Sequence, residues 1–420
     1  MNIPEGFQDI VKKSMESNPR LKKVFILSSL AGDKEAVASV MEMATASSLR
    51  QILKPTVPEA FYPPPTAKDF KGKFYLGTGV GYNPSTETDD LTKGIVTLGS
   101  IGVGKTNSAF YDMQQFHSLG KKFLHLGFKQ SVRHFEEIPI LTLTTGTKVN
   151  FYGQIFDYPP PGVDVIQWDL LSSRVFGGTT YILDAGQSLL LQVITELRRE
   201  GKHVNPTTIL EKLKKIKTSF GREGEWKATL INRFTEFNIV CGGMFSREVR
   251  FPLEKLIESH NIEIELDSAG HFAPFIATMI IAYLYEYRKA NNIRGNKLIT
   301  PIMCDELHSL VNTTMAQYFQ KEELPLLDYM RKGREFGIGL VLFTNEIKTI
   351  PSAIKTQAHI KIMMRCADFN EIQAMGSAMN LTQEQMELCL DLPVGWGIVK
   401  IPEIAPFLTY FPLVGGKDDN

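Results

Sequence analysis

Short apolar runs recur along residues 74–413 and alternate with segments of helical spacing. Apolar runs of strand length lie at 94–98, 122–126, 262–266, 297–304, 337–345, 360–364 and 395–399. Helical patterns lie at 184–199, 206–216, 275–288 and 369–390, the last reading as a lid segment. Strands that alternate with helices are typical of a mainly parallel sheet with helices on its faces. The pattern therefore predicts an α/β fold.

Three segments carry more specific signals. Pro301 removes a ladder donor from its apolar run, so we expect the strand proper to begin after it. Residues 142–156 alternate in a way that suits strands. The helix at 206–216 follows Asn205, a typical helix cap, and bears lysines at 212, 214, 215 and 217. That basic face can contact a phosphate backbone or can simply be solvated, which is the commoner case.

Composition shifts divide the chain into parts. The predicted parts are a small, mostly helical appendage at 1–70, a main domain at 71–413 with a largely helical insertion at about 140–260, and a flexible tail at 414–420. Within the appendage we expect a short strand at 24–27 and a helix capped by Asp33. The proline-rich residues 55–65 cannot continue a helix and read as a linker.

Composition and charge narrow the classes of protein. With 43% apolar residues, a chain of 420 residues can bury one large core or two ordinary ones. Lys plus Arg equals Asp plus Glu, 46 each, so a nucleic acid would have to be held by a local stripe of positive charge. The apolar run at 272–284 contains Pro274 and is too short to cross a bilayer, and we expect a cytoplasmic protein. The four cysteines lack CxxC spacing, which argues against a zinc site.

A glycine-rich loop follows the apolar run at 94–98. It reads Gly99, four residues, then Gly104-Lys105-Thr106, and a helical segment follows. Glycines at 99, 102 and 104 can adopt positive φ and leave no Cβ to block a phosphate, so that backbone N–H groups converge on it. The helix N-terminus adds donors and a positive dipole.

This loop predicts a nucleotide site. Lys105 would reach the β- and γ-phosphates, and the Thr106 hydroxyl would bind Mg²⁺. The alternative is a glycine turn with a surface lysine. The candidate residues for binding ATP are Gly99, Ser100, Ile101, Gly102, Val103, Gly104, Lys105, Thr106 and Asn107.

Two carboxylates end the apolar run at 297–304. Asp305 and Glu306 would lie at the carboxyl edge of a parallel sheet, where doubly wound folds bind their ligands. Asp305 would hold the Mg²⁺ through water, and Glu306 would polarise the attacking water as general base. Such a pair alone is usually a helix cap or a surface pair, and the glycine loop is what favours the catalytic interpretation.

Polar residues near the next apolar run complete the predicted site. Thr344 and Asn345 end the run at 337–345 and could sense the γ-phosphate, or could merely cap a turn. Arg331 and Arg334 precede that run, on a helix end that we expect beside the same edge. An arginine there can reach the nucleotide of a neighbouring subunit, or can be an ion-pair residue.

From about residue 74 to 413, the order of these motifs resembles the HerA branch of the HerA/FtsK P-loop ATPases. Beyond the generic glycine loop, three segments carry the resemblance: Ile264-Glu-Leu-Asp267, Cys304-Asp-Glu-Leu-His308 and Gly333-Arg-Glu-Phe-Gly337. The resemblance implies a hexameric ring that hydrolyses ATP between subunits and drives double-stranded DNA through a pore, commonly beside a nuclease. It also implies that Arg334 or Arg331 acts across the subunit interface.

The chain departs from this family at three places. Gly127 occupies the end of the second strand, where the family usually has an acidic residue, and Asn345 replaces a glutamine. Residues 1–70 do not resemble the family's N-terminal β-barrel. Two other functions therefore stay open: a conjugative coupling or genome-packaging ATPase, and an ATP-gated scaffold ring that regulates a bound effector enzyme.

Overall fold

The computed structural model describes residues 58–129, 135–143, 154–217, 221–245, 252–311, 314 and 325–414. By contacts, the chain divides into residues 1–62 and 63–420, and the fold below is that of the second unit. The strand expected at 24–27 and the helix expected after Asp33 lie outside the described residues, as do 415–420 of the expected tail.

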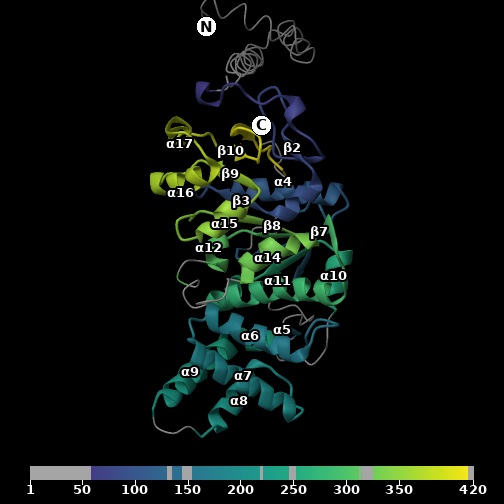
Figure 1. The fold of residues 1–420 in the computed structure, drawn as a ribbon, viewed down its shortest axis with the longest axis vertical. Helices are drawn as coiled ribbons and strands as arrows, with labels where there is room; N and C mark the ends of the chain where they lie inside the picture. Colours follow the sequence, from purple (N-terminus) through teal and green to yellow (C-terminus); the bar gives the residue numbers. More distant parts are fainter. Residues whose placement is uncertain are drawn as a thin grey trace, which may run out of the picture. The chain divides into compact units, whose positions relative to one another are not determined.

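A nine-stranded sheet forms the centre of the second unit (Figure 1). Its order is β11 (Phe407–Tyr410), β10 (Trp396–Lys400), β9 (Ile360–Met364), β3 (Ile95–Leu98), β8 (Phe336–Thr344), β7 (Gly295–Cys304), β4 (Leu124–Gly127), β6 (Ile262–Glu265) and β5 (Leu141–Leu143). The seven strands from β9 to β5 run parallel, and β10 is antiparallel to both of its neighbours. A separate two-stranded sheet pairs β1 (Phe74–Tyr75) with β2 (Ser85–Thr86). The predicted α/β fold with a mainly parallel sheet is confirmed.

Pro301 lies inside β7, so the expectation that this strand begins after it is wrong. The proline pairs with Gly339 of β8, whereas the pairing of β7 with β4 starts only at Ile302. The first part of β7 therefore has one strand neighbour, and a missing N–H on its other side breaks no ladder.

Helices cover both faces of the sheet. On one face, Met113 and Phe116 of α4 (Lys105–Ser118) share a buried cluster with Met303 of β7 and Phe343 of β8. On the other face lies α11 (Ala273–Ala290), which contacts β8. Around it pack α12 (Leu307–Leu310), α14 (Pro325–Lys332) and, beyond α14, α15 (Ser352–Gln357). This arrangement leaves the carboxyl edge of the parallel strands to the loops.

The helix α11 is the longest apolar segment. Residues Asp267–Ala290 are long and apolar enough to cross a membrane by length and composition, but 83% of their most apolar window is buried inside the protein. Pro274 lies in the first turn of α11, where a proline is tolerated, and so does not interrupt the run as the sequence suggested. Burial against the sheet accounts for the apolar composition.

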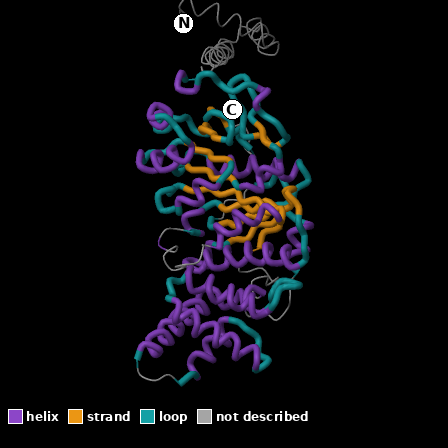
Figure 2. Tube along the Cα trace, viewed as in Figure 1, coloured by secondary structure: helices purple, strands orange, loops and turns teal. Residues whose placement is uncertain are grey.

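A group of helices follows β5 and precedes β6 (Figure 2). It comprises α5 (Gln154–Asp157), α6 (Val165–Thr179), α7 (Asp184–Arg199), α8 (Pro206–Lys215), α9 (Arg222–Phe245) and α10 (Leu253–Ser259). Its core is aromatic: Phe176 stacks on Phe234 with ring centroids 4.5 Å apart, and Phe156 contacts both rings. The strands expected over 142–156 reduce to β5 and the start of α5 within the described residues.

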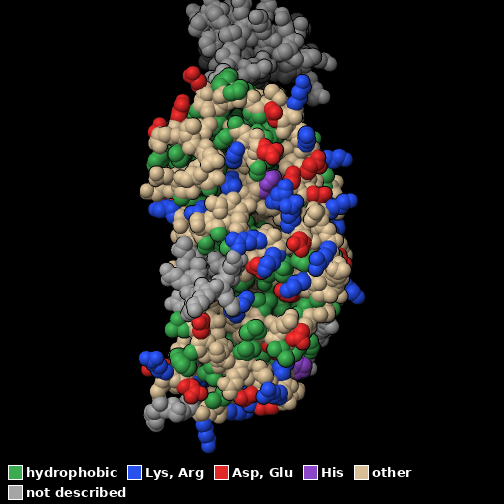
Figure 3. All heavy atoms as spheres, in the orientation of Figure 1, with side chains coloured by type: hydrophobic (Ala, Val, Ile, Leu, Met, Phe, Trp, Pro, Cys, Tyr) green, Lys and Arg blue, Asp and Glu red, His purple; other side chains and the backbone are tan. Residues whose placement is uncertain are grey.

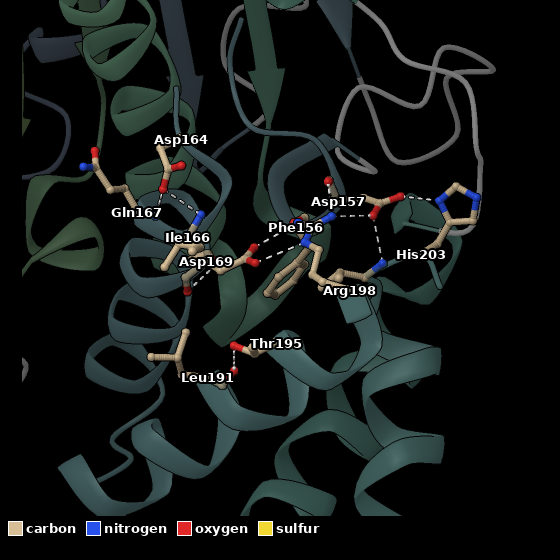
Figure 4. Close-up of polar contacts among 12 residues, drawn as sticks. Phe156, Asp157, Asp164, Ile166, Gln167, Asp169, Leu191, Thr195, Arg198 and His203 are labelled. Atoms are coloured by element: carbon tan, nitrogen blue, oxygen red, sulfur yellow. Dashed lines mark hydrogen bonds and ion pairs between the residues drawn. The ribbon is translucent and has the colours of Figure 1, made fainter. Parts of the chain in front are cut away.

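A partly buried arginine joins three of these helices (Figure 4). Arg198 of α7 lies 2.9 Å from Asp169 of α6 and 3.2 Å from Asp157 of α5. The same guanidinium donates to the carbonyl oxygens of Phe156 and Asp157, and His203 contacts Asp157 at 2.5 Å. Each nitrogen of the guanidinium therefore donates hydrogen bonds within this group of helices.

The surface shows no single-signed stripe on the face drawn in Figure 3, where Lys and Arg lie among Asp and Glu. On α8, Lys212 pairs with Glu196 at 3.0 Å and Glu200 at 2.5 Å. One of the four lysines of the predicted basic face therefore forms ion pairs, whereas Lys214 and Lys215 are exposed.

The predicted lid segment is two helices, α16 (Phe369–Met379) and α17 (Gln383–Leu388), separated at Asn380.

Candidate nucleotide and magnesium site

The glycine loop joins β3 to α4, as the sequence predicts. Gly102 and Gly104 have φ of 78° and 103°, values that favour glycine. Gly99 does not share this conformation, so the expectation of positive φ at all three glycines is wrong. At Gly99 a larger residue lacks space, because a Cβ would lie 2.8 Å from a methyl of Val103.

Neighbouring strands fix the loop in place. The backbone N–H of Gly99 donates to the Thr344 carbonyl at 3.2 Å, and that of Ser100 donates to the Arg365 carbonyl at 2.9 Å. Gly395 donates to the Val103 carbonyl at 3.0 Å. The loop is therefore held at the ends of β8 and β9 and by the turn before β10, which pre-organises its free N–H groups.

Lys105 is the first residue of α4, and its ammonium lies against the loop. The Nζ atom donates to the carbonyls of Gly99 and Ser100, each at 2.6 Å. Burial lowers the pKa of Lys105 to about 8, and the charge of Glu306 opposes that shift. A cation held under the loop in this way is placed to meet a phosphate.

Part of the predicted loop and the two predicted carboxylates meet in one cavity of about 350 Å³ at the carboxyl edge of the sheet. Its lining includes Ile101, Gly102, Gly104, Lys105, Thr106, Asp305, Glu306 and Asn345. Between the loop on β3 and the carboxylates after β7 lies β8, so the strand order brings the two motifs together across one strand. Gly99, Ser100, Val103 and Asn107 do not line this cavity.

Asp305 has the environment of a metal ligand. Its Oδ1 accepts from the backbone N–H of Phe128 at 2.9 Å, whereas its buried Oδ2 has no hydrogen-bond partner among the described residues. Burial raises the pKa of this carboxyl, and the charge of His125 opposes that effect. A carboxylate oxygen without a partner and the Thr106 hydroxyl in one cavity form an oxygen donor set that suits Mg²⁺.

Glu306 is buried, and both of its oxygens are engaged. Oε1 forms an ion pair with Lys129, and Oε2 lies 3.1 Å from Nδ1 of His308. The Lys129 side chain is 61% exposed and lines the same cavity. Lys129 could not be predicted from the sequence, because it follows a strand whose neighbours the sequence does not reveal. His308 entered the prediction only as part of a motif.

Asn345 and Thr344 behave differently. Asn345 lines the cavity, and its buried Oδ1 has no hydrogen-bond partner in the part of the chain that the structure describes. Thr344 caps a turn instead, because its hydroxyl accepts from the N–H of Glu346 and donates to the carbonyl of the same residue, each at 3.1 Å. Of the two expected sensors, only Asn345 remains a candidate.

Asn107 does not bind within the cavity through its side chain. Its amide donates to the Pro412 carbonyl and accepts from the N–H of Val414, each at 2.8 Å. Asn107 therefore anchors the segment that follows β11 to α4.

Arg331 and Arg334 do not lie beside the carboxyl edge, so that part of the prediction is wrong. They belong to α14 and the turn Gly333–Glu335, which precede the amino end of β8. Nine residues of strand, about 30 Å, separate them from the site of their own chain. Arg331 donates to the side-chain oxygen of Gln357 at 2.6 and 2.8 Å. A role at the site of a neighbouring subunit stays a prediction.

Solved structures with the same arrangement of elements show the fold. VirB4 of Thermoanaerobacter pseudethanolicus is 12% identical, with a TM-score of 0.64 over 82% of this chain and 98% of its own. The bacterial conjugative coupling protein TrwBdeltaN70 is 12% identical, with a TM-score of 0.57 over 84% and 91%. TrwB in complex with ADP and Mg²⁺ is 12% identical, with a TM-score of 0.55 over 83% and 92%.

No family model matches the sequence, and no curated protein matches it either. The likeness to VirB4 and TrwB therefore concerns the fold, at an identity too low to carry function. The fold prediction is confirmed: the chain has the P-loop NTPase fold that it shares with VirB4 and TrwB.

Proposed function

We propose that this protein is a Mg²⁺-dependent ATPase. The observation that carries the proposal is the single cavity lined by Lys105 and Thr106 on one side and by Asp305 and Glu306 on the other. A phosphate-binding loop alone would support binding, whereas two carboxylates facing it supply what hydrolysis needs.

Each residue has a distinct task in this proposal. Lys105 and the loop N–H groups bind the β- and γ-phosphates, and Thr106 and Asp305 hold Mg²⁺. The metal ion would neutralise charge on the phosphate oxygens. Glu306 orients the attacking water and accepts its proton, while Asn345 lies within reach of the terminal phosphate.

The proposed work of this ATPase is to form a cytoplasmic ring, most simply a homohexamer, that moves or pumps double-stranded DNA. In this proposal a nuclease or another effector acts beside the ring. The fold shared with VirB4 and TrwB supports a motor of this kind. Ile101 and Val394 line the same cavity and are exposed, so that a neighbouring subunit could cover them.

Two alternatives each have an observation in favour. The name of TrwB favours a conjugative coupling ATPase, because it is called a coupling protein. The contacts of Glu306 with Lys129 and His308 favour an ATP-gated scaffold ring, because they engage both oxygens of the proposed base.

DNA-stimulated ATP hydrolysis separates these functions. The motor and the coupling ATPase should hydrolyse ATP faster when double-stranded DNA is added, and a motor should also displace a third strand from a DNA triplex. A scaffold ring should bind ATP with slow turnover that DNA leaves unchanged. Hydrolysis that ignores DNA would overturn the motor proposal.

A further inference from the structure

A buried histidine and glutamate lie beside the cavity that contains the proposed magnesium ligand. His125 of β4 and Glu263 of β6 face each other in the register of the two strands. The two side chains are 1% and 0% exposed, and Nδ1 of His125 lies 3.5 Å from Oε1 of Glu263. His125 also lines the cavity that holds Lys105 and Asp305.

Both facing atoms lack a hydrogen-bond partner in the described part of the chain. The unpaired buried atoms there include His125 Nδ1, Glu263 Oε1 and Asp305 Oδ2. The other oxygen of Glu263 accepts a long hydrogen bond, 3.3 Å, from the Thr142 hydroxyl. A buried pair that served only stability would be expected to use its hydrogen bonds, since an unused one costs about 1–3 kcal/mol.

The absence of a side chain at Gly127 leaves space for the His125–Glu263 pair. A Cβ at this position would lie 3.0 Å from Oε1 of Glu263 and 3.4 Å from Cε1 of His125. Any side chain at 127 would therefore displace the pair. The carboxylate of Glu263, from the neighbouring strand, occupies the space that a longer residue at 127 would fill.

The pair connects to Asp305 through geometry. Phe128, the residue after Gly127, donates its N–H to Asp305 Oδ1 at 2.9 Å, so the end of β4 sets the position of this carboxylate. His125 pairs with Met303 of β7, two residues before Asp305, and His125 and Asp305 line the same cavity. In metal sites, groups behind a ligand fix its orientation in this way.

We propose that His125 and Glu263 are positioning residues for the magnesium ligand Asp305. Glu263 confines the His125 ring by close contact, with the facing atoms 3.5 Å apart, and the ring holds the Asp305 carboxylate toward the cavity. This inference rests on the proposed Mg²⁺-dependent ATPase. It assigns the pair a task that the loop and the two carboxylates do not fulfil by themselves.

The test measures metal binding with Mn²⁺ as a paramagnetic probe. The full chain is loaded with a non-hydrolysable ATP analogue, and free Mn²⁺ is followed by electron paramagnetic resonance. Glu263→Gln keeps the shape of the side chain and should weaken Mn²⁺ binding about 10- to 100-fold, with the melting temperature preserved. His125→Gln should do the same, and the double variant should lose no more than either single one, because the two residues act as a unit.

Turnover provides the second readout. In Glu263→Gln, excess Mg²⁺ should restore the maximal ATPase rate while the half-saturating Mg²⁺ concentration stays raised. Glu265→Gln is the matched control, since Glu265 is also buried on β6 but pairs with Gly127 rather than with His125. It should bind Mn²⁺ like the unchanged protein.

Failure of the inference is distinguishable from failure of the proposed function. If the unchanged protein binds Mn²⁺ with nucleotide and hydrolyses ATP, but both single variants bind Mn²⁺ equally tightly, the positioning role is wrong. If the unchanged protein binds no Mn²⁺ with nucleotide, the proposed function itself is wrong. A His125 variant that melts early leaves the isosteric Glu263→Gln to decide.

Discussion

At the scale of single residues, Lys105 is the group on which nucleotide binding depends most. Its ammonium lies against the loop carbonyls, and no other Lys or Arg except Lys129 lines the cavity among the described residues. Lys105→Ala should weaken ATP binding at least ~30-fold, the equivalent of the ~2 kcal/mol lower bound for losing a buried charged contact. Calorimetric titration measures this loss. Lys73→Ala, an exposed lysine of the same unit, should bind ATP normally.

Lys129 tests whether its ion pair restrains the proposed base. Lys129→Ala frees Oε1 of Glu306, which must otherwise leave the ion pair to accept a proton from water. Turnover without DNA should rise, by about fivefold at most, because a half-exposed pair is worth at most ~1 kcal/mol. Steady-state hydrolysis of ATP measures the change. An unchanged rate would mean that Lys129 does not restrain Glu306, and a slower rate would mean that Lys129 assists catalysis.

At the scale of elements, Arg198 joins α5, α6 and α7 into one body. Its side chain is 20% exposed and lies within ion-pair distance of Asp157 and Asp169. Arg198→Ala leaves both carboxylates without their cation and should cost about 3–5 kcal/mol of the free energy of unfolding. Urea denaturation measures the cost. Arg199→Ala, at the exposed neighbouring position, should change stability by no more than ~0.5 kcal/mol.

Elements with strong apolar patterns could be predicted from the sequence. The helix α7 has the predicted bounds, and β3, β6, β8 and β9 lie within a residue or two of their apolar runs. The strand β11 was missed, because Phe407–Tyr410 is short and follows a proline-rich loop. Such a run gives too few positions for its period to show.

The candidate site could be predicted only as far as local motifs reach. The loop is one continuous segment of the sequence, and so is the Asp305-Glu306 pair, so the chemistry of each could be predicted. The cavity brings the two together. His125, Glu263 and Lys129 could not be found in this way. They approach the site only because β4 lies between β7 and β6, and strand order is a property of the whole fold.

At the scale of the whole molecule, the proposed ring places part of each site on a neighbour. Arg334 is exposed and about 30 Å of strand away from the loop of its own chain, so any contact with a nucleotide must be made across an interface. Arg334→Ala and Lys105→Ala should each be inactive alone. Mixed rings should regain part of the ATPase rate, since some interfaces then combine an intact loop with an intact arginine. A mixture as inactive as its components would exclude Arg334 from a role in trans.

The central claim is that Glu306 acts as the base in a cavity that binds ATP. The most direct measurement compares ATP binding with ATP hydrolysis in purified Glu306→Gln and in the unchanged protein. The substitution removes a proton acceptor and keeps the shape of the side chain, so binding should persist while turnover falls about 10²- to 10⁴-fold. Normal hydrolysis by Glu306→Gln would contradict the account.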